Sequence, residues 1–122
     1  MSTRKYSAAT PAHLLDAYAE AARAHAKATL EANPEEANRQ YHELHSVYAE
    51  LRRRGPREIR RLAPLLSDPH AGVRLWAATH LLEVDPAGSE SVLRELAKQG
   101  DLIGFSAETT LDQWRKGNLS FG

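Results

Sequence analysis

The sequence predicts an all-α fold with about six helices arranged as three antiparallel pairs. Alanine occurs 20 times, whereas isoleucine occurs twice and valine four times. Alanine loses no side-chain entropy in a helix, whereas β-branched residues fit pleated sheets. A capping side chain precedes proline at four places, which is typical of helix starts. These four residues are Thr10, Asn33, Asp68 and Asp85.

The start signals and the glycines at expected helix ends together divide the chain into elements. The predicted helices span residues 11–32, 34–54, 56–67, 69–84, 87–99 and 101–116. Gly55, Gly100 and Gly117 follow three of these segments, and glycine adopts the left-handed closing conformation at little cost. The connection at Asn33 is very short, so the first two helices are expected to form an antiparallel hairpin.

The second predicted helix carries the clearest apolar stripe. Its members recur at helical spacing and predict one face packed along the whole helix. The stripe consists of Ala37, Tyr41, Leu44, Tyr48 and Leu51. The first helix carries a thinner stripe of the same kind, as a packed partner would.

The second half of the chain resembles itself after a shift of 30 residues. Leu66 then falls on Leu96, Ala77 on Ala107 and Leu81 on Leu111. Such a period is typical of stacked helix pairs. We therefore expect a single domain over residues 1–122. Its expected parts are a flexible tail (1–9), a helical hairpin (10–55), two repeats (56–85 and 86–117) and a second tail (118–122).

The stretch from Leu65 to Ala78 resembles the signature of a HEAT-like repeat. It contains leucines, Asp68-Pro69, Val73-Arg74 and an alanine pair. Over residues 37–121 the order of landmarks resembles a small bacterial HEAT-like family that is catalogued as a domain of unknown function. The resemblance implies a short HEAT-like helical-repeat solenoid without a catalytic motif. Some HEAT-like families of this size are immunity proteins, so it also implies, as a hypothesis, an antitoxin role.

Two features of the repeats are expected to serve the fold. In HEAT-type stacks, an Asp at the position of Asp68 and an Arg at that of Arg74 form hydrogen-bonded ladders between neighbouring pairs. Gly104, inside the last predicted helix, costs about 1 kcal/mol relative to alanine. It therefore indicates either a kink or a close approach of two backbones.

Catalysis, metal binding and membrane insertion find little support in the sequence. There is no cysteine, no glycine-rich phosphate loop and no nucleophile motif. His42 and His45 have a spacing of three residues rather than the four of a zinc-protease helix, and no third ligand is evident. We therefore expect no enzyme activity, no metal and no cofactor. The absence of a long apolar run or an apolar leader favours a cytoplasmic protein.

The net charge of zero conceals two oppositely charged regions. Between Arg52 and Arg61 six arginines face one acid, whereas residues 78–113 hold seven acids and two bases. Arginine presents a planar fork to phosphate or carboxylate, so an anion- or nucleic-acid-binding module is the alternative function. Nucleic acid is disfavoured because no aromatic residue lies between Tyr48 and Trp76. The basic patch comprises Arg52, Arg53, Arg54, Arg57, Arg60 and Arg61.

The favoured function is a non-catalytic protein-binding module. Leu75 and Phe105 occupy matching positions in the two repeats and could form an exposed apolar row flanked by acids. Apolar anchors within a charged rim are what a protein partner needs. The hypothetical partner is a cognate toxin whose active site is occluded, and against a nuclease the acidic half would mimic nucleic acid. The predicted contact residues are Leu75, Thr79, Glu83, Phe105, Glu108 and Asp112.

Overall fold

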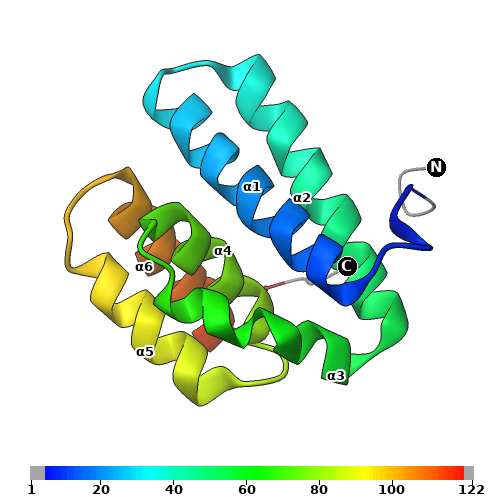
Figure 1. Cartoon of the computed structure of the whole chain (residues 1–122). Helices are drawn as coiled ribbons and strands as arrows, with labels where there is room; N and C mark the ends of the chain where they lie inside the picture. The colour runs from blue at the N-terminus through cyan, green and yellow to red at the C-terminus, as the bar shows by residue number, and fades with distance from the viewer. Residues whose placement is uncertain (1–4, 120–122) are drawn as a thin grey trace. The chain divides into compact units, whose positions relative to one another are not determined.

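The computed structural model describes residues 5–119 and is built from helices (Figure 1). The helices are α1 (Pro11–Leu30), α2 (Pro34–Arg54), α3 (Pro56–Ile59), the 3-10 helix η2 (Arg60–Ser67), α4 (Ala71–Leu81), α5 (Pro86–Ala97) and α6 (Leu102–Arg115). No strand occurs within the described range, so the predicted all-α class is confirmed. No helix in that range combines the length and the apolar character needed to cross a membrane.

Three of the four predicted helix caps are confirmed. The side chains of Thr10, Asn33 and Asp85 accept hydrogen bonds from backbone N–H groups three residues further on. The fourth prediction is wrong, because α4 begins at Ala71 with His70 as its cap. Asp68 Oδ1 instead accepts from the backbone N–H of His70 at 2.8 Å, and this local turn delays the helix by two residues.

The predicted helix over residues 56–67 is divided into two parts. Only Pro56–Ile59 is α-helical, and the chain continues as η2, which contains Pro64. Proline lacks the N–H that an α-helix needs and clashes with the preceding turn, which accounts for the change of helix type. The three glycines expected at helix ends do adopt positive φ angles, of +115°, +70° and +74°.

The chain forms two compact units, and the division falls between Leu62 and Ala63, inside η2. The boundary therefore cuts through the predicted repeat 56–85 and assigns its first helix to the first unit. That assignment has a physical basis, since α3 packs against α2 and Ile59 is buried. The single domain and the HEAT-like solenoid remain predictions.

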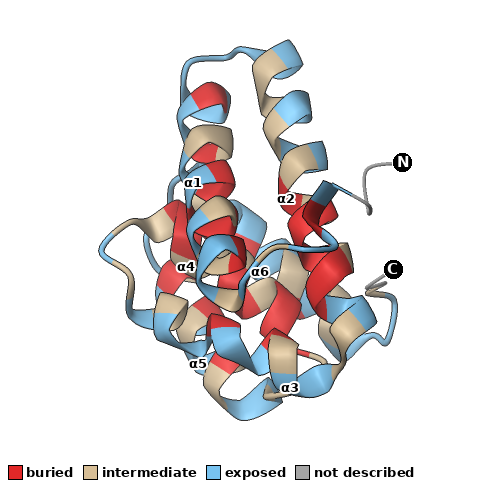
Figure 2. Cartoon of the chain, turned by 45° about the vertical axis from the view of Figure 1, so that its right-hand side comes forward, coloured by how far each residue is buried: buried red, intermediate tan, exposed pale blue. Residues whose placement is uncertain are grey.

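In the first unit, α1 and α2 lie side by side as the expected antiparallel hairpin (Figure 1). Leu14 and Tyr18 on α1 are fully buried, as are Leu44 and Leu51 of the predicted stripe on α2. Towards the connection between the two helices, exposed and half-buried residues predominate (Figure 2). There Leu30 is 68% exposed, so this end of the hairpin offers accessible surface.

The segment Lys5–Ala9, which the sequence analysis assigns to a flexible tail, is instead held against α2. Tyr6 is buried, and its hydroxyl donates to the Glu43 carboxylate. Lys5 Nζ also donates to Glu43, at 2.6 Å. Glu43 thus anchors the segment to α2. Residues 1–4 of that predicted tail lie outside the described range, as do residues 120–122 of the other.

The second unit is formed by α4, α5 and α6 around one apolar core. The core residues are Ala78, Leu82, Leu93, Leu96, Ala107 and Leu111. Gly104 lies where α6 approaches α5, because a Cβ atom at this position would be 2.9 Å from the Leu96 carbonyl oxygen. The expected close approach of two backbones is therefore confirmed.

Candidate interaction surfaces

The outward side of α6 is the most apolar exposed helix face in the second unit. Phe105 is 69% exposed and Leu102 is 55% exposed. The spacing of three and four residues places Glu108, Thr109 and Asp112 on the same side of the helix, and all three are exposed. We call these five residues the α6 outer face. The opposite side of α6 carries Gly104, Ala107 and Leu111, all buried.

The predicted row of contact residues is split between two environments. Phe105, Glu108 and Asp112 belong to the α6 outer face, as the sequence indicates. Leu75 does not join them as an exposed anchor, since it is partly buried and packs against the core of the second unit. Burying its aliphatic side chain in that core is more favourable in free energy than leaving it exposed to water. The prediction of an exposed Leu75 is therefore wrong.

The other two predicted residues, Thr79 on α4 and Glu83 in the turn after it, are half-buried. The Thr79 hydroxyl donates to the backbone carbonyl of Leu75 at 2.8 Å, a bond within its own helix. Glu83 also has an interaction partner. Neither side chain is as accessible as those on α6, which narrows the candidate surface to one helix.

Of the acids in the segment 78–113, two cap helices and two others form exposed ion pairs. Asp85 and Asp101 cap α5 and α6, where each accepts from the backbone N–H of a glycine. Glu95 pairs with Lys98 at 3.4 Å, and Asp112 pairs with Lys116 at 3.0 Å, in both cases at exposed positions. Glu108 has no such partner among residues 5–119 and contributes an uncompensated negative charge to the α6 outer face.

Much of the predicted basic patch is engaged in internal contacts. Glu50 lies just before the last turn of α2 and is completely buried. Its carboxylate accepts hydrogen bonds from both Arg53 and Arg54. Arg54 also donates to the carbonyl oxygens of Tyr6, Ser7 and Ala9, at 3.3, 3.3 and 2.8 Å. Hydrogen bonds from Arg53 and then Arg54 hold the pKa of Glu50 below its usual value of 4.5. Arg54 therefore joins α2 to the N-terminal segment.

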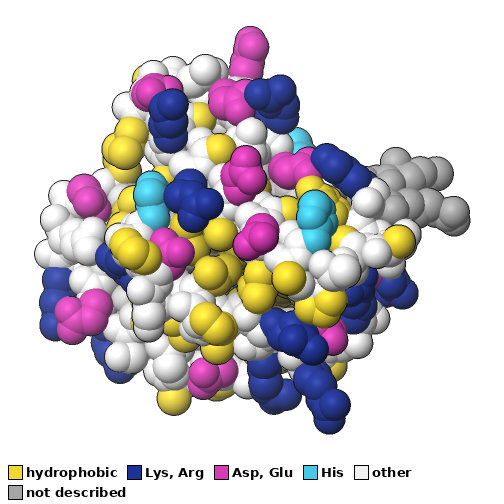
Figure 3. Space-filling model, viewed as in Figure 1, with side chains coloured by type: hydrophobic (Ala, Val, Ile, Leu, Met, Phe, Trp, Pro, Cys, Tyr) yellow, Lys and Arg dark blue, Asp and Glu magenta, His cyan; other side chains and the backbone are white. Residues whose placement is uncertain are grey.

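The remaining arginines of the basic patch differ in whether their side chains have partners within the protein. Arg61 pairs with Glu58 at 2.5 Å, and Arg52 is also engaged. Arg57 and Arg60 are exposed and have no ion-pair or hydrogen-bond partner for their side chains within residues 5–119. Lys and Arg side chains gather around α3 in the space-filling view (Figure 3). The basic surface that the sequence predicts thus reduces chiefly to two arginines.

The histidines of α2 lie in an aromatic cluster. The ring of His45 packs on Tyr41 with 4.2 Å between centroids, and His42 meets the same tyrosine edge-on at 5.6 Å. Burial, followed by the charges of His42 and His25, lowers the pKa of His45. Within the described part of the chain, no three His, Asp or Glu side chains are grouped as metal ligands.

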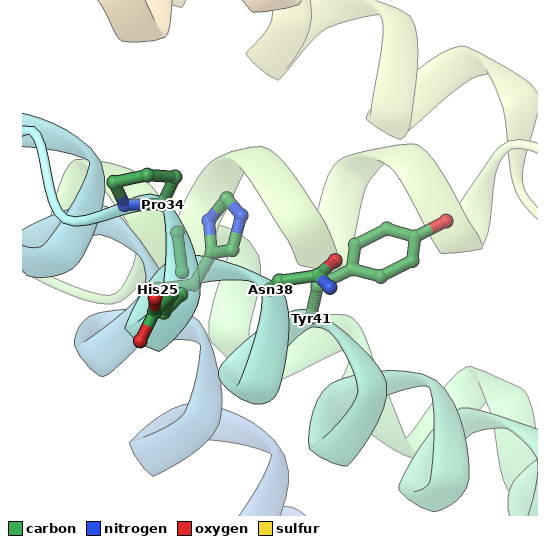
Figure 4. A pocket seen from close by; sticks show the side chains of 6 residues that line it. His25, Pro34, Asn38 and Tyr41 are labelled. Atoms are coloured by element: carbon green, nitrogen blue, oxygen red, sulfur yellow. The ribbon is translucent and has the colours of Figure 1, made fainter.

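A pocket of about 600 Å³ opens near the connection of α1 and α2 (Figure 4). Its lining comes from both helices of the hairpin. The lining residues are His25, Pro34, Glu35, Ala37, Asn38 and Tyr41. The sequence indicates Tyr41 only as part of an apolar stripe and gives no sign of this pocket, because its wall forms only where two helices meet.

Comparison with a solved structure supports the fold. The crystal structure of the protein RPA1889 from Rhodopseudomonas palustris CGA009 is similar to this chain, with a TM-score of 0.87 and 22% sequence identity. The similarity covers 94% of this chain and 96% of that protein. At this identity it shows a shared fold and nothing about activity.

The sequence also matches a protein-family model. The model described as "Domain of unknown function (DUF2019)" matches residues 12–114, which extend from α1 to α6. No functionally curated protein matches the chain. The predicted resemblance to a family of unknown function is confirmed, whereas its HEAT-like character stays a prediction.

Proposed function

The chain belongs to this DUF2019 family, and from its own surface we propose that it is a non-catalytic protein-binding module whose α6 outer face contacts a partner protein. The observation that carries the proposal is the exposure of Phe105, at 69%, beside Leu102, at 55%. Large aromatic and aliphatic anchors of this kind dominate binding energy once a partner removes them from water. Among the described residues, neither side chain belongs to the apolar core of the second unit or to the residues packed against it.

The charge of the α6 outer face indicates the kind of partner. Glu108 lies beside the apolar pair with no ion-pair partner among residues 5–119, whereas Asp112 is paired with Lys116. The complementary surface is therefore apolar with a basic group opposite Glu108. A basic toxin domain meets this description. The specific form of the proposal is therefore an immunity protein that covers a toxin's active site, an idea that derives from the resemblance to HEAT-like families.

The experiment is capture of a partner by the full chain from a lysate of the organism that encodes it, after nuclease treatment. Phe105→Arg should abolish capture of any specific protein. Leu30→Arg is the matched control, because Leu30 is equally exposed at 68% but lies on α1. A protein retained by wild type and by Leu30→Arg, but lost with Phe105→Arg, supports the proposal. Equal retention by all three chains contradicts it.

The same experiment separates the anion-binding alternative, which rests on the exposed Arg57 and Arg60. Omitting the nuclease and comparing the Arg57→Ala/Arg60→Ala variant tests that alternative directly. Nucleic acid bound by wild type and lost with this double variant would favour it. For the immunity form, expression of the captured protein should harm a host cell, and co-expression of this chain should restore growth.

A further inference from the structure

The pocket at the connection of α1 and α2 offers a second binding chemistry, in the first unit. Figure 4 shows its labelled side chains, with His25 contributed by α1 and Pro34, Asn38 and Tyr41 by α2. The volume of about 600 Å³ falls within the range of small-ligand sites. Because the pocket is open to solvent, it suits a side chain presented by a partner better than a fully enclosed molecule.

Two hydrogen-bond acceptors in the pocket are available. The side chains of Glu35 and Asn38 are exposed, and neither has a hydrogen-bond or ion-pair partner among residues 5–119. The neighbouring Glu36 differs, since its carboxylate is occupied by Arg39 and Gln40. Glu35 therefore gives the pocket a net negative charge that the protein does not itself neutralise.

The aromatic wall of the pocket is compatible with a cation. Tyr41 is 38% exposed, so part of its ring can be reached by a ligand. The ring of His25 lies 6.5 Å from that of Tyr41. Burial lowers the pKa of His25 from its usual value, which favours the uncharged imidazole and reduces repulsion of a positive group.

We propose that this pocket binds the guanidinium group of an arginine side chain on a partner protein. The planar guanidinium can stack on Tyr41 while its N–H groups donate to Asn38, three residues away on the same helix, and Glu35 supplies negative charge to the same pocket. An ammonium group lacks that planar fork, so arginine should be preferred to lysine. The positive end of α2 does not favour an anion here, because Glu35 and Glu36 already occupy the first turn. The inference is independent of the α6 outer face.

The test uses the full chain and a small probe, so it needs no identified partner. N-acetyl-arginine methylamide is titrated while the NMR signals of Glu35 and Asn38 are followed. N-acetyl-citrulline methylamide, which has nearly the same shape but no charge, is the control ligand. We expect the arginine probe to shift these signals and the citrulline probe to bind about fivefold more weakly. Equal binding of the two probes, or tighter binding of inorganic phosphate at these residues, would overturn the proposal.

Variants of the pocket make the assignment specific. Glu35→Gln should weaken the arginine probe about threefold, since an exposed ion pair contributes little more. Glu31→Gln is the matched control, because Glu31 is an exposed acid near the same connection but does not line the pocket. Tyr41→Phe should retain binding and Tyr41→Leu should lose it. Loss with Glu31→Gln, or full binding with Tyr41→Leu, contradicts the proposed geometry.

Discussion

The arginine-rich end of α2 and the outer face of α6 use their conspicuous side chains in opposite ways. Arg53 and Arg54 bind the fully buried Glu50, and Arg54 also holds three carbonyl groups of the N-terminal segment. On α6, Leu102 and Phe105 are largely exposed and do not belong to the apolar core of their unit. The charged side chains at the end of α2 therefore stabilise the fold, whereas the apolar side chains of the α6 outer face remain exposed to solvent.

The contrast teaches that density of charge along a sequence is a weak guide to a binding surface. A carboxylate that is buried needs compensation, and nearby arginines are consumed in supplying it. An exposed aromatic residue has no comparable internal use. We therefore consider the α6 outer face a better candidate for an interaction site than the basic segment. The following substitutions test this ranking of the two surfaces.

Arg54→Ala should cause a large loss of stability. The variant leaves the buried Glu50 carboxylate with Arg53 alone and frees the carbonyls of Tyr6, Ser7 and Ala9. Removing one partner of a largely buried ion pair should lower the free energy of unfolding by about 2 to 3 kcal/mol. Urea denaturation measures the change. Arg57→Ala, the matched control, should leave the unfolding midpoint unchanged, and equal losses in the two variants would contradict the internal role of Arg54.

Gly104→Ala should have the next largest effect and tests the inner side of α6. An added Cβ atom would lie 2.9 Å from the Leu96 carbonyl oxygen, so α5 and α6 must move apart. We expect a loss of about 1 to 2 kcal/mol, although alanine is intrinsically the better helix former. Thermal denaturation of wild type and Gly104→Ala measures this loss of stability. An increase in stability would show that the two backbones are not tightly apposed.

Acid should weaken the arginine-rich end selectively. The pKa of Glu50 lies below its usual value of 4.5, because its charged form accepts hydrogen bonds from Arg53 and Arg54. Its contribution to stability is therefore complete above pH 4.5 and is lost as the pH falls through the lowered value. Unfolding measured across this range should depend less steeply on pH in Arg54→Ala than in wild type. Identical slopes would contradict the assignment.

Phe105→Ser should have the smallest effect on stability. An exposed side chain outside the core contributes little to folding, so the change should stay within about 0.5 kcal/mol. The same substitution on a core residue of α6, such as Leu111→Ser, should be strongly destabilising and serves as the comparison. Chemical denaturation of both variants gives the answer. A large loss with Phe105→Ser would mean that Phe105 belongs to the core after all.

The sequence predicted the helices better than the surfaces. Thr10, Asn33 and Asp85 combine a capping side chain with a following proline, and this local signal suffices to place a helix start. At Asp68 the same signal failed, because the carboxylate bonds to His70 in a turn. Such a choice between two local hydrogen bonds is settled by the surrounding packing, which the sequence pattern does not contain.

The contacts at the candidate sites are likewise of two kinds, those set by local helical spacing and those that depend on the tertiary fold. The pairing of Glu50 with Arg53 and Arg54 follows helical spacing of three and four residues and could have been anticipated. Arg54 also contacts Tyr6, Ser7 and Ala9, which lie 45 to 48 positions away in the sequence. No local sequence pattern predicts these contacts. The exposure of Phe105 likewise depends on which side of α6 the core occupies.

The most direct test of the ranking is the affinity of the captured partner for two variants, measured by calorimetry against wild type. Phe105→Ala should weaken binding about 30-fold, the effect of losing a central aromatic anchor. Arg57→Ala/Arg60→Ala should bind as wild type does. The reverse pattern, with full affinity in Phe105→Ala and a large loss in the double arginine variant, would contradict the account and place the interaction on the basic segment.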